Sequence, residues 1–165
     1  MMKTNPNNKG YTLLFAVLVS SIVLSIGISI LTISKKEFLL SASARDSTSA
    51  FYAADSGLEC AAYYDGQGNF STTSPQIDNI ISCAGYVVQS HDVLGNSDDM
   101  TFVIQIPIGT NGACSIVSVE KYYDDDDIAT TRILSRGYNV GWLGTALGCT
   151  DTSSRRVERA LQLTY

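Results

Sequence analysis

The stretch Tyr11–Ser34, which reads YTLLFAVLVSSIVLSIGISILTIS, decides how this chain of 165 residues is organised. Its 24 residues include no charged side chain and no proline. A helix of that length measures about 36 Å, and the hydrocarbon core of a bilayer is about 30 Å thick. The stretch therefore predicts a helix that can cross a membrane.

The residues on either side of this stretch indicate that the mature protein keeps it. In front of it stands a short polar leader, Met1–Gly10, which carries two lysines and ends in glycine. A secretory signal is cut behind its apolar region, after small residues. Here the small residues behind the stretch, Ser41–Ala44, follow two lysines and a Phe-Leu-Leu sequence, which is a poor cleavage context. The cut is therefore expected in front of the stretch, between Gly10 and Tyr11.

The sequence around this cut, Lys9-Gly10-Tyr11-Thr12-Leu13-Leu14, resembles the type III signal of type IV prepilins and pseudopilins. The resemblance implies that a membrane-bound prepilin peptidase cuts after Gly10 and methylates the new N-terminus at Tyr11. It also implies that the apolar helix first anchors the subunit in membrane lipid and later packs in the core of a filament. The implied partners are other pilin or pseudopilin subunits, the prepilin peptidase and an inner-membrane assembly platform.

One position departs from the pattern of this family. The fifth mature residue is usually a glutamate that pairs with the N-terminal amine of a neighbouring subunit, and this chain has Phe15 there. Some minor subunits at the filament tip also lack this glutamate. The resemblance therefore implies a minor structural subunit with a priming or tip-proximal position, and not the abundant subunit of the shaft.

Residues 35–65 continue the helical pattern but become amphipathic. Apolar residues recur there at steps of three and four, namely at Phe51, Ala54, Leu58 and either Ala61 or Ala62. This spacing predicts a helix with one face packed on a sheet. The sequence AFYAADSGLE at residues 50–59 resembles the A-x-x-A-A-E-A-G-L-E signature of PilX-type minor pilins. Gly57 is expected to let the helix approach the sheet closely.

The remaining residues, 66–165, predict a small β-rich head. Turn residues end the helix at Asp65–Asn69. Runs of β-type residues follow at 85–90, 101–106, 114–123, 129–137 and 155–165. The glycine-rich stretch Gly137–Gly148 is expected to form a loop that holds the only tryptophan, Trp142. One long helix followed by short strands is an α+β plan, and an antiparallel sheet packed on that helix is the pilin fold that the resemblance implies.

The four cysteines predict two disulfide bonds in this head. They are Cys60, Cys83, Cys114 and Cys149, and none forms a C-x-x-C pair or stands beside a histidine at a zinc-ligand spacing. An even number of cysteines in a small exported head is typical of a disulfide framework. Three pairings are possible. We favour Cys60–Cys83 with Cys114–Cys149, because each bond then closes a moderate loop within one half of the head.

The charge of the chain argues against nucleic-acid binding. Removal of the leader leaves nine basic residues against sixteen acidic ones, a net charge of −7. Proteins that bind nucleic acid directly need a basic surface. No direct contact with nucleic acid is therefore expected.

The run Asp124-Asp125-Asp126-Asp127 is the most conspicuous polar feature of the head. Calcium takes six to eight oxygen ligands, so a group of carboxylates is a candidate calcium site. The run lacks the alternating spacing that aims several carboxylates at one ion, and mutual repulsion favours an exposed hairpin turn. Both interpretations stay open, and the turn is the one we favour. No other cofactor is indicated.

Nothing in the sequence indicates an enzyme. The only histidine, His91, precedes Asp92 in a polar segment without a nucleophile motif beside it. No glycine-rich phosphate loop ends in Lys-Ser or Lys-Thr, so a motor that drives assembly must be another protein.

The expected location is the bacterial inner membrane, with a single pass and the head outside the cytoplasm, and then an extracellular pilus. Lysines stand on both sides of the apolar stretch, so this orientation rests on the prepilin resemblance. Two other functions stay open. One is a minor pseudopilin of type II secretion, and the other is a signal-anchored extracellular binding or adhesive protein that never enters a filament. A membrane-anchored hydrolase is disfavoured, because no base and nucleophile are paired.

Overall fold

The structure is a computed structural model, and it describes residues 9–71, 81–88, 91–96, 99–109, 112–123, 128–142, 149 and 153–165. The chain opens with one helix, α1 (Lys9–Gly66), which begins two residues before the predicted start. The chain divides into two compact units, Met1–Ser43 and Ala44–Tyr165. In the first unit the described part is helical throughout. The second unit, called the head below, contains the rest of α1 and all the strands, an α+β arrangement as predicted.

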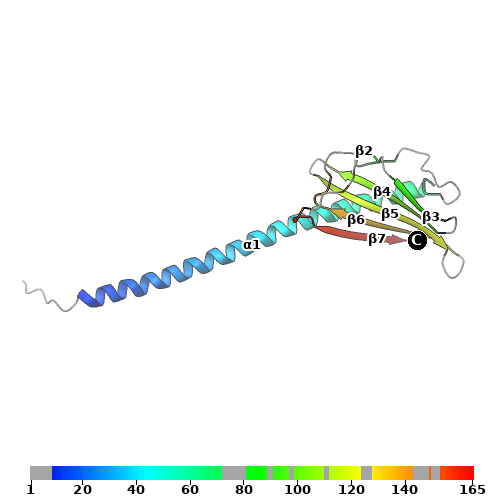
Figure 1. The fold of residues 1–165 in the computed structure, drawn as a ribbon. Coiled ribbons are helices and arrows are strands. Elements are labelled where there is room, and N and C mark those ends of the chain that lie inside the picture. Colours follow the sequence, from blue (N-terminus) through cyan, green and yellow to red (C-terminus); the bar gives the residue numbers. More distant parts are fainter. Residues whose placement is uncertain are drawn as a thin grey trace, which may run out of the picture. The chain divides into compact units, whose positions relative to one another are not determined.

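The strands of the head form two antiparallel sheets (Figure 1). The larger sheet has the order β3-β4-β5-β6-β7, so every strand is bonded to its neighbour in sequence. Its strands are β3 (His91–Asn96), β4 (Asp99–Ile108), β5 (Ala113–Tyr123), β6 (Ala129–Tyr138) and β7 (Glu158–Thr164). The smaller sheet pairs β1 (Ser82–Cys83) with β2 (Tyr86–Val87).

Three details of the predicted head were wrong. The strand β3 lies outside the predicted β-type runs, yet each of its residues from His91 to Asn96 pairs with a residue of β4. The short strand β1 also lies outside those runs. Tyr138 was assigned to a loop, but it extends β6 one residue beyond the predicted run 129–137 and pairs with Glu158 of β7.

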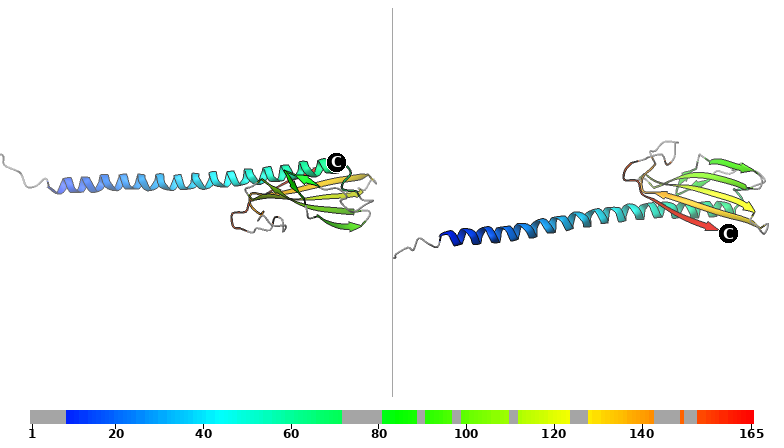
Figure 2. Two further views of the ribbon diagram at one scale, coloured as in Figure 1. Left: turned by 90° about the horizontal axis from the view of Figure 1, so that it is seen from above. Right: turned by 60° about the horizontal axis from the view of Figure 1, so that its bottom comes forward.

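Small residues form the contact between α1 and the larger sheet, where the last turns of the helix run along one face (Figure 2). The helix residues that this contact buries completely or nearly so are Ala50, Ala53, Ala54, Gly57 and Ala61. Phe51 was expected on the buried face, but 45% of it is exposed. A phenylalanine has no room there because the helix backbone lies directly on the sheet.

Two glycines show how close this approach is. A Cβ added to Gly137 of β6 would lie 2.8 Å from Ala54 Cα and closer still to the backbone oxygen of Ala50. On the helix side, a Cβ added to Gly57 would meet Oγ of Ser135 at 2.7 Å and the side chain of Ser115. Gly57 therefore permits the close packing that the sequence predicted, and Gly137 is its counterpart in the sheet.

The two serines opposite Gly57 give a first testable prediction. Ser115 and Ser135 are fully buried, and neither hydroxyl has a hydrogen-bond partner. A buried polar group without a partner costs about 1–3 kcal/mol, so we expect the double variant Ser115→Ala, Ser135→Ala to raise the free energy of unfolding by about 2 kcal/mol. Urea unfolding followed by the fluorescence of Trp142 measures this change. An unchanged or lower stability would show that the hydroxyls are satisfied in solution.

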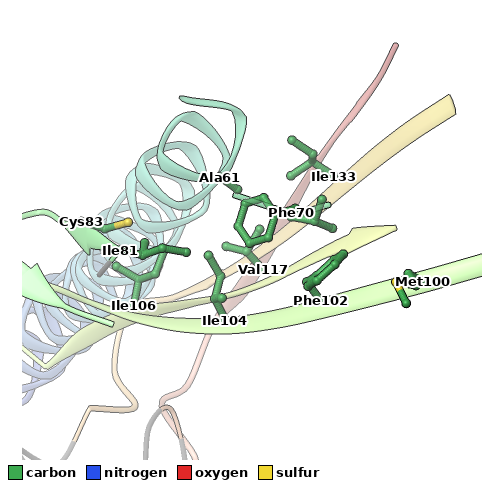
Figure 3. Packing of buried hydrophobic residues seen from close by; sticks show 11 residues of the cluster. Ala61, Phe70, Ile81, Cys83, Met100, Phe102, Ile104, Ile106, Val117 and Ile133 are labelled. Atoms are coloured by element: carbon green, nitrogen blue, oxygen red, sulfur yellow. The ribbon is translucent and has the colours of Figure 1, made fainter. Parts of the chain in front are cut away.

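The main core of the head lies between the last turns of α1 and the larger sheet (Figure 3). It contains eleven buried residues, namely Ala61, Phe70, Ile81, Cys83, Met100, Phe102, Ile104, Ile106, Val117, Val119 and Ile133. The side chains of β4 and β5 that enter it alternate with outward ones, as the two-residue period of a strand requires. The rings of Phe70 and Phe102 lie 5.4 Å apart and link the segment after α1 to β4.

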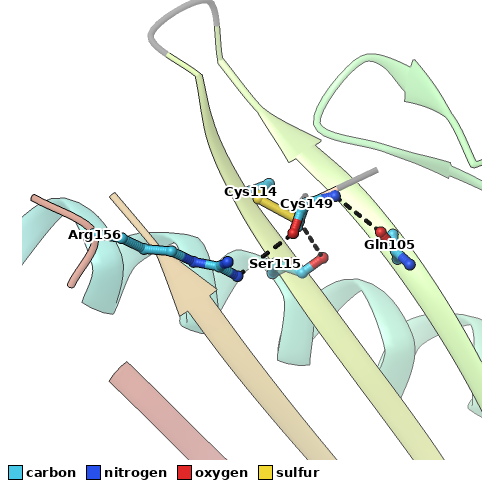
Figure 4. The surroundings of a disulfide bond; sticks show 5 residues. All are labelled: Gln105, Cys114, Ser115, Cys149 and Arg156. Atoms are coloured by element: carbon cyan, nitrogen blue, oxygen red, sulfur yellow. Dashed lines mark hydrogen bonds between the residues drawn. A yellow bond between two sulfur atoms is a disulfide. The ribbon is translucent and has the colours of Figure 1, made fainter. Parts of the chain in front are cut away.

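Two disulfide bonds join segments of the head that lie far apart in the sequence. Cys60 of α1 is bonded to Cys83 of β1, and Cys114 of β5 is bonded to Cys149. This is the pairing that the sequence favoured. The second bond ties Cys149 to β5. The backbone amide of Cys149 also donates to Oε1 of Gln105 on β4 at 2.9 Å (Figure 4). This disulfide also belongs to a second small core with Tyr138, which Ile116 and Trp142 complete.

Candidate functional site

The first candidate functional feature is the apolar part of α1. Every side chain from Tyr11 to Ser41 is exposed, including those of more than a dozen leucine, isoleucine and valine residues. An apolar surface of this extent marks a site that binds a membrane or other protein. Among the described residues, α1 is the one helix that is long and apolar enough to cross a membrane. A signal sequence near the N-terminus can also be long and apolar enough to qualify, so the choice between the two depends on where the chain is cut.

Four hydroxyl groups within this apolar helix bond to carbonyl oxygens of the helix itself. Oγ of Ser20 donates to the carbonyl oxygen of Ala16 at 2.7 Å, and Oγ of Ser29 donates to that of Ser25 at 2.9 Å. Ser21 and Thr32 bond to their own helix in the same way. In hydrocarbon every polar group needs an internal partner, and these bonds provide one. These four hydroxyl groups therefore add little polarity to the surface of the helix.

The residues of the predicted cleavage site lie in the first turns of α1. The helix includes Gly10, and Tyr11 and Phe15 are 74% and 57% exposed. The aromatic ring of Phe15 therefore adds to the apolar surface at the position where the family pattern has a carboxylate.

The second feature is a polar contact that ties the end of α1 to the sheet. Asp65, whose side chain is 5% exposed, forms an ion pair of 2.6 Å with Nζ of Lys121 on β5. Its other carboxylate oxygen accepts a hydrogen bond of 2.7 Å from the hydroxyl of Tyr165. The backbone of Tyr165 exchanges two hydrogen bonds with Thr131 of β6. Asp65 thus links the helix, β5 and the segment after β7.

This contact predicts a specific dependence of stability on alkaline pH. Burial, followed by the hydrogen bond and the negative charge of Asp65, raises the pKa of Tyr165 from 10.0 to about 12. The stabilisation is therefore fully present below pH 10 and is lost as the pH rises through 12. We expect the melting temperature of the parent to fall more steeply between pH 10 and pH 12 than that of Tyr165→Phe, as measured by circular dichroism. Parallel curves would contradict the assignment.

The third feature is a group of arginines at the opposite end of the sheet, which we call the arginine end. It comprises Arg136 on β6, Arg159 on β7, Arg155 and Arg156 in the segment before β7, and Arg45 on α1. The pairing of Gly137 with Arg159 and of Tyr138 with Glu158 places the end of β6 beside the start of β7.

Contacts that α1 makes with β7 and with the segment before β7 hold the arginine end together. Arg155, whose side chain is 79% exposed, lies 3.7 Å from the carboxylate of Asp46. Nε of Arg159 donates to Oγ of Ser47 at 2.9 Å. The amide side chain of Asn139 bonds to the backbone on both sides of Arg156, because it donates to the Arg155 carbonyl oxygen and accepts from the Val157 amide. Two exposed guanidinium groups are thus positioned beside one turn of the helix.

Arg156 has a structural role in this group. Its guanidinium group lies 3.7 Å from the centre of the Tyr138 ring, and its Nη2 donates to the carbonyl oxygen of Cys149 (Figure 4). The Tyr138 hydroxyl bonds to Glu158, and burial together with that carboxylate raises the pKa of Tyr138. Within this group, Arg155 thus pairs with a helix residue, and Arg156 stacks on an aromatic ring.

The remaining candidate residues do not form a site in the described part of the chain. The run Asp124-Asp125-Asp126-Asp127 lies outside the described residues, so the calcium prediction stays a prediction. Elsewhere in the described ranges no three His, Cys, Asp or Glu residues come together as metal ligands do. The aromatic residues Tyr138 and Trp142 lie with the second disulfide, whereas Tyr122 and Tyr123 end β5 at the other end of the sheet.

Comparisons with models of protein families, with curated proteins and with solved structures returned no match for this chain. The functional assignment therefore rests on the residues and contacts described above.

Proposed function

We propose that this chain is a non-enzymatic minor subunit of a bacterial type IV pilus, made as an inner-membrane precursor and assembled after cleavage between Gly10 and Tyr11. The observation that carries the proposal is the apolar part of α1, exposed over its whole circumference from Tyr11 to Ser34 and preceded by Lys9-Gly10. Such a helix needs an apolar environment on all sides. Lipid provides it before assembly, and a bundle of similar helices provides it afterwards.

The physical basis of assembly is an exchange of apolar neighbours. Burial of apolar surface contributes about 25 cal/mol per Å², so exposure of this helix to water at any stage would be strongly unfavourable. Moving from lipid into a helix bundle avoids that exposure. The internal bonds of Ser20 and Ser29 keep the helix surface apolar in both environments. A minor pseudopilin of a secretion system would use the same physics, and the two differ only in the filament that they join.

Phe15 suggests where in the filament this subunit stands. It offers no carboxylate to the N-terminal amine of a neighbour, and burying an unpaired ammonium group in an apolar bundle is costly. A priming or tip-proximal subunit contacts fewer neighbours on one side, so it needs fewer such pairs. This position would limit the protein to a few copies per filament.

The copy number in sheared filaments tests the proposal. We expect the parent in the filament fraction at a few copies per filament, and we expect Phe15→Glu to enter the shaft and raise this number severalfold, as measured by quantitative mass spectrometry. Phe15→Leu is the matched control and should behave as the parent. If Phe15→Glu enters no more often than the parent, the tip argument loses its basis. If the parent is absent from filaments, the proposed function is wrong and a signal-anchored binding protein becomes the better explanation.

A further inference from the structure

The charges of this protein are unevenly distributed. The mature chain has a net charge of −7, yet five of its nine basic residues belong to the arginine end. The described acidic residues there are Asp46 and Glu158. The described part of the arginine end thus has a net positive charge in a strongly acidic protein. A surface of this kind attracts an anionic partner.

The exposed arginines are available to such a partner. Arg45 and Arg136 are exposed on α1 and β6. Arg155 is 79% exposed, and its distance of 3.7 Å from Asp46 is that of a loose ion pair. Exposed ion pairs of this kind contribute little, because the solvent screens their attraction and two side chains must be held in one geometry. Arg155 therefore loses little binding free energy when another anion takes the place of Asp46.

We propose that the arginine end binds the anionic phospholipid headgroups of the membrane that anchors the chain. This inference rests on the membrane anchoring in the proposed function, but not on assembly into a filament. Only eleven residues, 35–45, separate the apolar stretch from Asp46 in the chain, so the head is tethered to the membrane by a short segment.

The contact must be close, because the attraction of an arginine to an anionic surface falls off within a Debye length, which is about 8 Å at physiological ionic strength. Each arginine near an anionic surface strengthens binding about fivefold. Headgroup binding would hold the head on the membrane before assembly, and extraction of the subunit would release it. An acidic surface on another subunit is the competing partner. The chain tethers Asp46 to the membrane, however, and it does not tether it to another subunit.

Arginine modification in nanodiscs tests this contact with the full-length processed protein. Discs of phosphatidylcholine alone are compared with discs that contain 30% phosphatidylglycerol. Phenylglyoxal modifies exposed guanidinium groups, and mass spectrometry reports the rate at each arginine. We expect the rates at Arg155 and Arg159 to fall at least fivefold in the anionic discs and to recover in 1 M NaCl, where the Debye length is about 3 Å. Arg132, which pairs with Glu120, should react equally in both discs.

A double variant separates lipid binding from a local effect on the two modified residues. In the parent, Arg45 and Arg136 should also be modified more slowly in the anionic discs. We expect the double variant Arg155→Gln, Arg159→Gln to weaken the attraction of the head to the anionic surface about 30-fold, so that Arg45 and Arg136 lose this protection. Arg132→Gln is the matched control and should keep it. Equal rates in the two kinds of disc would overturn the proposal even if the N-terminus is cut as proposed. Protection in filaments but not on anionic discs would also overturn it and would point to a protein partner.

Discussion

The variant Gly137→Ala is expected to unfold at a temperature about 10 °C lower than the parent, because it destabilises the head by about 3 kcal/mol. The added methyl group would lie within 3.0 Å of backbone atoms of Ala50 and Ala54, so no change of rotamer relieves the overlap. The helix would have to move away from the sheet along its whole contact. Thermal unfolding followed by Trp142 fluorescence measures the effect in detergent or nanodiscs.

The same substitution at Gly66 provides the matched control. A Cβ added there meets nothing within 4 Å, and its backbone has no left-handed conformation. Gly66→Ala should therefore change the free energy of unfolding by less than about 1 kcal/mol. If both variants unfold with the parent, the close packing of α1 on β6 is not a feature of the protein in solution.

The double variant Cys114→Ala, Cys149→Ala is expected to lose about 4 kcal/mol of stability. The bond closes a loop with a sequence separation of 35, and the chain-entropy model gives about 4 kcal/mol for such a loop. Loss of the bond would also leave the backbone hydrogen bond of Cys149 to Gln105 without its covalent anchor. Urea unfolding of the oxidised proteins measures the difference.

Reduction of the parent supplies the comparison for this variant. A thiol reductant breaks both disulfides of the parent but only Cys60–Cys83 in the variant. The reductant should therefore lower the stability of the parent more than that of the variant. Equal losses would show that the Cys114–Cys149 bond contributes nothing, and free thiols in the oxidised parent would show that it is not formed.

The fold was largely predictable because its main elements have strong local patterns. The apolar run from Tyr11 and the alternation in β4, β5 and β6 produced the correct α+β plan. The strand β3 was missed because three of the six residues in HDVLGN, namely Asp, Gly and Asn, are disfavoured in strands, and pairing with β4 determines its structure. The contact face of α1 was mistaken at Phe51, because apolar spacing does not reveal that the facing surface is the backbone of Gly137.

The arginine end illustrates what sequence order hides. Arg136 is nineteen residues from Arg155 and far from Arg45 in the chain, so nothing in the sequence indicates that they share one end of the head. The pairing of β6 with β7 and the contacts of Arg155 and Arg159 with α1 bring them together. The helix that is long and apolar enough to cross a membrane, in contrast, was visible in the sequence because it depends on composition and length alone.

The mass of the N-terminal peptide of the membrane-bound protein tests the central claim most directly. If the apolar helix is retained after prepilin processing, this peptide begins at Tyr11 and carries one additional methyl group on its amine. A peptide that begins at Met1 would contradict the claim, and so would a first residue beyond Ser34, since either shows that the helix is not the processed anchor of a pilus subunit.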